Sequence, residues 1–75
     1  MTRAEHLQWC KNRAIQEYDF YKDNKEKTRN GLTSMMSDMG KHSETKSDVV
    51  NALCVMQMGR HMPRQEFINF INGFN

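Results

Sequence analysis

The chain has 75 residues, with eleven Lys and Arg against nine Asp and Glu, and a formal net charge of +2. A chain of this length forms at most one domain, residues 1–75, and buries only a modest core. The near balance of charge argues against a dedicated nucleic-acid binder, which usually carries a strongly basic face. No stretch approaches the roughly 20 apolar residues that a membrane span needs, so we expect no membrane partner.

The polar, charged N-terminus does not resemble a signal peptide. Cys10 and Cys54 stand 44 positions apart, which fits neither a zinc motif nor a disulfide framework. We therefore expect two reduced thiols and a cytoplasmic protein.

The first predicted helix covers residues 2–22. It begins at a capping box, in which Thr2 and Glu5 each satisfy a free backbone amide of the other. Neither Pro nor Gly interrupts the stretch. Steps of three and four place the following apolar residues on one face: Leu7, Cys10, Ala14, Tyr18 and Tyr21.

The second predicted helix covers residues 24–39 and is capped by Asp23 or Asn24. Gly31 weakens its interior by about 1 kcal/mol relative to Ala. Gly40 is placed to end it in a left-handed conformation. Its apolar positions also recur at steps of three and four: Leu32, Met35, Met36 and Met39.

The third predicted helix, residues 48–58, is apolar on more than one side, which predicts the most buried helix of the bundle. Gly59 ends it, and Pro63 suits the first position of a fourth helix over residues 63–72. The buried face of that helix is expected to hold Phe67, Ile68, Ile71 and Phe74. Together these patterns predict an all-α fold, a small bundle of about four helices.

His6 and Cys10 are four residues apart and could both reach one metal ion, but they make only half of a zinc site. Cys54 and His61 add a second pair only if folding brings them close. A Cys–His nucleophile would also need an orienting group and a water-excluding pocket, for which so short a chain has little room. We expect no metal, no cofactor and no enzymatic activity.

Seven methionines are present, five of them in the second and third predicted helices. The flexible thioether favours filling of an irregular core, and an adaptable binding surface is the alternative. Among these five, Met36 or Met58 is expected to be exposed.

A second stripe runs along the first predicted helix, about 130° from its apolar face at 100° per residue. Aromatic anchors with Arg between them are typical of protein interfaces. The alternative is that a neighbouring helix of the same chain covers this stripe. The predicted partner-binding residues are Trp9, Arg13, Gln16 and Phe20.

The segment KDNKEKTR at 22–29 is the nearest approach to a basic strip, although Asp23 and Glu26 interrupt it. A solvated linker or helix start is the plainer interpretation. As an alternative function, an accessory protein of nucleic acids would contact phosphates through Lys22, Lys25, Lys27 and Arg29.

The segments RAEHLQWCKNRA at 3–14 and FINGFN at 70–75 resemble a group of small proteins of tailed, T-even-like bacteriophages that carry no assigned function. The resemblance spans the chain and is most specific at its two ends. The chain departs from the group at Ser43, where a proline is expected, and at Met62, where Ser or Thr is expected. The resemblance implies a phage protein in the cytoplasm of the infected bacterial host, and it transfers no active site.

Small non-enzymatic phage proteins commonly bind and redirect a host or phage protein. By this analogy the chain is predicted to modulate such a protein during infection through the aromatic and Arg stripe, with homo-oligomer formation left open. Nucleic acid is the less favoured partner.

Overall fold

The computed structural model describes residues 2–41 and 47–74, and within these ranges the regular structure is entirely α-helical. The predicted small all-α bundle is therefore confirmed, and each predicted helix boundary lies within two residues of the observed one. Four helices follow one another in the chain: α1 (Arg3–Phe20), α2 (Asn24–Met39), α3 (Ser47–Gln57) and α4 (Arg64–Asn72).

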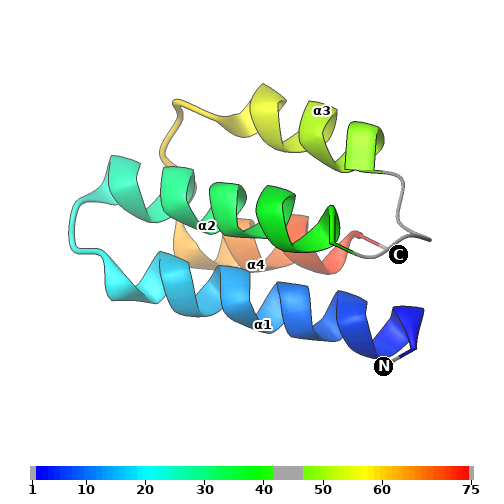
Figure 1. The fold of residues 1–75 in the computed structure, drawn as a ribbon. Helices are drawn as coiled ribbons and strands as arrows, with labels where there is room; N and C mark the ends of the chain where they lie inside the picture. Colours follow the sequence, from blue (N-terminus) through cyan, green and yellow to red (C-terminus); the bar gives the residue numbers. More distant parts are fainter. Residues whose placement is uncertain (1, 42–46, 75) are drawn as a thin grey trace.

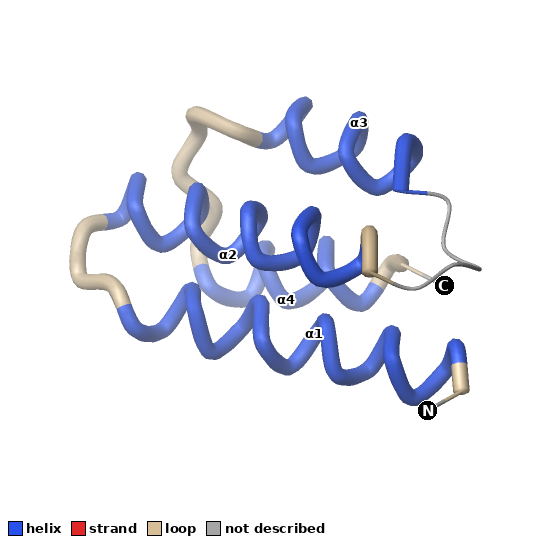
Figure 2. The backbone as a smooth tube through the Cα atoms, viewed as in Figure 1, coloured by secondary structure: helices blue, strands red, loops and turns tan. Residues whose placement is uncertain are grey.

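The helices alternate in direction, so that α2 and α4 run opposite to α1 and α3 (Figure 1). The pair α1 and α2 forms the most extensive helix–helix contact of the fold. In Figure 2, α3 lies along α2 on the side away from α1, and α4 lies behind α1 and α2. Because α3 packs mainly on α2, much of its surface has no neighbouring helix.

The helix starts agree with the capping residues that the sequence indicates. The Thr2 hydroxyl accepts from the Glu5 amide at 3.1 Å, and the Glu5 carboxylate accepts from the Thr2 amide at 3.0 Å. At α2, the Asp23 carboxylate accepts from the amides of the second and third residues that follow it. The prediction for Gly40 is wrong: it caps α2 with a φ of −67°, in the right-handed region.

A cluster around the Phe67 ring forms the centre of the core. This ring stacks on Tyr18 of α1 with centroids 4.6 Å apart, and both side chains are buried. Gly31 of α2 faces the same ring so closely that a Cβ atom there would lie 2.5 Å from the ring tip. The glycine therefore leaves room for the Phe67 ring of α4 to lie against α2. Other buried apolar residues include Cys10, Ala14, Leu32, Met35, Met39, Cys54 and Ile71.

The connection between α3 and α4 is fixed to the bundle at Met62, whose side chain is buried. The Met62 amide donates to the Thr28 hydroxyl at 3.0 Å, and the Met62 carbonyl accepts from the Tyr18 hydroxyl at 2.6 Å. Both backbone groups of one buried residue are thus satisfied by side chains of α1 and α2. Here Met62 fills the position where the phage group is expected to have Ser or Thr, whereas Ser43 lies outside the described residues.

Replacing Thr28 by valine is expected to lower the free energy of unfolding by about 1 to 2 kcal/mol. The substitution conserves shape but leaves the Met62 amide buried without an acceptor, and an orphaned buried donor is costly. Urea denaturation measures the change. Thr33→Val on the exposed side of the same helix is the matched control and is expected to change stability less. Equal effects of the two variants would contradict the role given to the Thr28 hydroxyl.

The start of α4 is tied to the end of α1 by a two-fold contact of Arg64 with Asp19. The guanidinium donates to the two carboxylate oxygens at 2.9 and 3.1 Å. This hydrogen bonding lowers the pKa of Asp19 from its ordinary value. The pair is largely exposed, so it orients the two helix ends more than it stabilises them.

The structure corrects the prediction that α3 is the most buried helix. Its buried apolar residues are Val50 and Cys54, while Val49, Leu53, Val55 and Met56 are exposed. Periodicity shows that several sides of a helix are apolar, but it does not count the neighbours available to cover them. In a chain of four helices, α3 lies at the edge of the bundle.

The methionine prediction is corrected at the same helix. Met36 and Met58 are half-buried against the core, whereas Met56 is 74% exposed. The core interpretation holds for Met35 and Met39, which are buried.

Candidate interaction surfaces

All four predicted partner-binding residues are exposed on one side of α1. We call this set, Trp9, Arg13, Gln16 and Phe20, the α1 face. At 1.5 Å per residue, Trp9 and Phe20 lie about 16 Å apart along the helix axis. The described part of the chain therefore leaves the stripe uncovered, and α4 packs against another side of α1.

Trp9 is held in place by two neighbours, although it is 38% exposed. Its ring stacks on His6 with centroids 5.8 Å apart and an interplanar angle of 27°. The Arg13 guanidinium lies 5.2 Å from the ring centroid on the same helix, within the range of a cation–π contact. The tryptophan is thus a partly ordered apolar surface rather than a freely rotating side chain.

Arg13 has a structural role that the sequence did not reveal. Its Nε donates to the Asp38 carboxylate of α2 at 2.8 Å, and Asp38 is almost fully buried. Lys41 and Ser34 also donate to this carboxylate, at 3.3 and 3.4 Å. The hydrogen bond to Asp38 raises the pKa of Arg13. The guanidinium therefore bridges α1 and α2 while its flat side supports Trp9.

A polar groove of about 230 Å³ lies beside the α1 face, between α1 and α2. Its walls include Arg13 and Glu17 of α1 and Asn30, Ser34 and Asp38 of α2. The α1 face thus combines exposed aromatic rings with an adjoining polar depression, the mixture that protein interfaces show.

Phe20 marks the other end of the α1 face and is 76% exposed. Its ring packs edge to face against Tyr21, with centroids 5.1 Å apart. Single exposed apolar side chains are common on proteins, but one this open at the end of an aromatic stripe is a candidate anchor.

The structure does not bring the four basic candidates together on one face. Lys27 turns back onto α1, where its Nζ donates to the Tyr18 carbonyl at 3.3 Å and lies over the Tyr18 ring. Arg29 approaches Glu26 at 3.9 Å, while Lys22 and Lys25 are exposed. A phosphate strip would need cations aligned and unpaired, so this geometry favours the alternative function less than the sequence does.

The His6 and Cys10 side chains do lie together, with the Cys10 sulfur 3.7 Å from Nε2. Burial raises the pKa of the Cys10 thiol to about 11, and burial likewise raises the pKa of the Cys54 thiol to about 11. Both thiols are therefore protonated at neutral pH and are poor nucleophiles. Among the described residues, no group of three or more His, Cys, Asp or Glu side chains could hold a metal ion.

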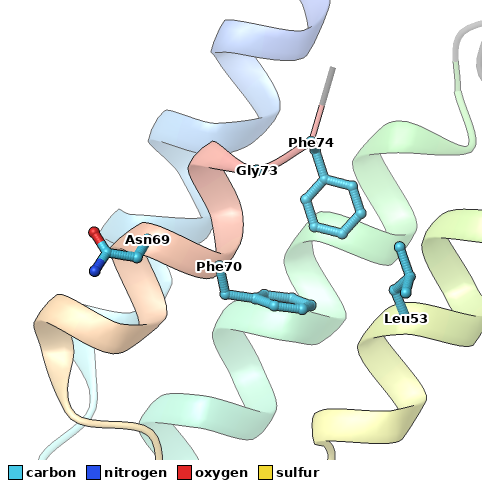
Figure 3. Close-up of a pocket in the computed structure, with 5 residues that line it drawn as sticks. All are labelled: Leu53, Asn69, Phe70, Gly73 and Phe74. Atoms are coloured by element: carbon cyan, nitrogen blue, oxygen red, sulfur yellow. The ribbon is translucent and has the colours of Figure 1, made fainter.

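A second surface, which the sequence analysis missed, lies between α3 and α4. Phe70 and Phe74 pack edge to face with centroids 5.4 Å apart and point toward Leu53 of α3 (Figure 3). With Asn69 and Gly73 they line an open apolar groove of about 320 Å³. The sequence feature that indicates this surface is the apolar character of α3 on several sides, which also fits a buried helix.

Comparison with known protein families, with curated proteins and with solved structures found no match. Across residues 2–41 and 47–74, no helix combines the length and apolar character needed to cross a bilayer. The molecule is thus defined by its fold and surfaces, as a small all-α protein with two exposed apolar regions.

Proposed function

We propose that this chain is a small non-enzymatic interaction protein. It binds a host or phage protein through the α1 face in the cytoplasm of an infected bacterium and modulates that protein's activity. The observation that carries the proposal is the joint exposure of the four α1-face side chains on one side of the helix. The phage setting rests on the sequence resemblance at 3–14 and 70–75.

The arrangement of the α1 face supports binding, because the Trp9 side chain is already restricted and loses less conformational entropy when a partner binds. Stacking on His6 and Arg13 restricts Trp9 before any partner arrives, and α1 itself is anchored to α2 through Arg13 and Asp38. A binding site with restricted side chains loses less conformational entropy on association. Aromatic and Arg residues also carry a large share of the binding energy in most protein interfaces.

The side chains of the α1 face indicate what kind of surface its partner has. Two apolar pockets about 16 Å apart would take Trp9 and Phe20. Polar groups between these pockets would face Gln16 and the groove between α1 and α2. The surface of a folded protein that is at least as long as the distance between Trp9 and Phe20 along α1 meets this description.

Replacing both Trp9 and Phe20 by alanine is expected to abolish partner binding while the helical content is unchanged. Tagged wild-type and variant proteins are purified from infected bacteria, and the bound proteins are identified by mass spectrometry. Direct titration of the identified partner with the purified variant then measures the loss, which we expect to exceed about tenfold.

Val55→Ala is the matched control, since it removes a comparable exposed apolar side chain from α3. It is expected to retain the partner. Undiminished binding by the Trp9/Phe20 double variant would contradict the proposal. Unfolding of that variant, detected by circular dichroism, would instead assign the two residues to the core and also defeat it. Affinity that falls steeply with salt and disappears with Lys22→Ala/Lys25→Ala would favour the nucleic-acid function.

A further inference from the structure

The outward side of α3 is an apolar stripe that no helix among the described residues covers. Val49, Ala52, Leu53 and Met56 are all exposed, and their spacing of three and four places them on one line. Val50 and Cys54, about a third of a turn away, are buried against the bundle. We call the four exposed residues the α3 stripe.

The α3 stripe adjoins the groove between α3 and α4, because Leu53 belongs to both (Figure 3). The exposed stripe and the rings of Phe70 and Phe74 form one continuous apolar region. Contiguous apolar regions of this kind mark interaction sites on soluble proteins.

We infer that the α3 stripe binds a second copy of this chain, with the two α3 helices antiparallel about a two-fold axis. The charge pattern favours this occupant. Asp48 lies in the first turn of α3 and Arg60 follows the end of the helix, and every residue from 49 to 59 is uncharged. A two-fold axis sets a surface against itself, so a charged stripe would repel its own copy, whereas this stripe does not.

The side chains of the α3 stripe are complementary to themselves in one register. With the axis between positions 52 and 53, the small Ala52 faces the larger Leu53 of the second copy. In the same register Val49 faces Met56 of the second copy, and the symmetric contacts repeat on the other side. Large residues meeting smaller ones let two helices approach closely.

The ends of α3 are complementary as well. The antiparallel register brings Asp48 within about one turn of Arg60 of the second copy, at the C-terminal end of that helix. The Arg60 guanidinium contacts Glu66 of its own chain at 2.7 Å, so Asp48 would be a second carboxylate beside this cation. Antiparallel helix dipoles also attract each other. A parallel pair would instead place Asp48 against its own copy.

The area available sets the strength of this dimer. A standard interface buries about 800 Å² on each partner, about one sixth of the 4724 Å² that the chain exposes. An 11-residue helix is about 16 Å long and supplies less than this area, even with the groove beside it. The expected dimer is therefore of the weak class, with a dissociation constant on the order of 10 µM.

Sedimentation velocity over a range of concentrations measures the association directly. The wild-type chain is expected to shift from monomer to dimer across roughly the micromolar range. The variant Met56→Lys would set two ammonium groups against apolar side chains, so we expect dimerisation to weaken by about tenfold or more. Val55→Lys is the matched control, because Val55 is also exposed on α3 but lies about 100° from Met56.

A charge-paired double variant tests the register. In Val49→Glu/Met56→Lys, the antiparallel arrangement sets each new carboxylate opposite a new ammonium group of the other copy. We expect this double variant to recover dimerisation to within about threefold of wild type, with a stronger dependence on salt. In a parallel pair the like charges would face each other and no recovery would follow.

A wild-type chain that stays monomeric at several hundred micromolar would overturn the inference. Equal weakening by Met56→Lys and Val55→Lys, or a double variant no better than Met56→Lys, would overturn it also. Both α3 substitutions lie on the surface, and circular dichroism verifies that the variants are folded. The Trp9/Phe20 double variant is expected to dimerise normally, which separates this surface from the α1 face.

Discussion

Replacing Phe67 by alanine is expected to remove a large share of the stability of this protein. The ring is fully buried, stacks on Tyr18, and fills the space above Gly31 where α1, α2 and α4 meet. Truncating such a ring typically costs about 3 to 5 kcal/mol, from lost apolar burial and the cavity left behind. At 0.05 to 0.15 kcal/mol per residue, a chain of this length has roughly 4 to 11 kcal/mol in total.

Urea denaturation followed by circular dichroism measures this loss. The matched control is Phe20→Ala, which deletes the same ring from a side chain that is 76% exposed. The control is expected to change the free energy of unfolding by less than about 0.5 kcal/mol. If the two phenylalanines had similar effects, the Phe67 ring would not be the centre of the core.

The local elements of the fold were predictable because their signals are local. The capping box of Thr2 and Glu5 lies within one turn, and the Asp23 cap lies beside the helix it starts. Gly59, with a φ of 91°, lies just beyond α3 as the sequence indicates. Each of these depends on residues that are neighbours in the chain, so no knowledge of the tertiary structure is needed.

Contacts between distant residues were not predictable in the same way. Arg13 and Asp38 are 25 positions apart, and nothing in the sequence indicates that they pair. The Met62 backbone likewise depends on Thr28 and Tyr18, which belong to two other helices. Such contacts follow from the relative placement of helices, which periodicity does not supply.

The exposure of side chains was predicted better at α1 than at α3, for a physical reason. Helix geometry alone places Trp9 and Phe20 on a different side of α1 from Cys10 and Ala14, and exposure follows once α2 and α4 cover the other sides. For α3, the apolar positions surround the helix, so the sequence does not indicate which side is buried. The buried side is the one that packs on α2, and Met56 lies on an exposed side.

Gly31→Ala is expected to destabilise the protein, although alanine has a higher helix propensity than glycine. Alanine in a helix interior is favoured over glycine by about 1 kcal/mol, so local propensity alone predicts a gain in stability. The added methyl would lie 2.5 and 2.8 Å from two Phe67 ring atoms and 3.2 Å from the Ala14 carbonyl oxygen. The ring cannot retreat easily, because Tyr18 stacks on it.

Overpacking of a buried site costs about 1 to 3 kcal/mol, and three simultaneous close contacts place Gly31 at the upper end. After the helix gain is subtracted, a net loss of roughly 2 kcal/mol is expected in urea denaturation. Thr33→Ala, on the exposed side of α2, is the control and is expected to leave stability unchanged or slightly higher.

The double variant Gly31→Ala/Phe67→Leu identifies the cause. Leucine removes the ring tip that the new methyl would strike, so the two substitutions should be less harmful together than their separate effects predict. We expect the coupling between them to be about 1 kcal/mol or more, as for residues in direct contact. Additive effects would instead show that Gly31 matters for a reason other than its close contact with the Phe67 ring.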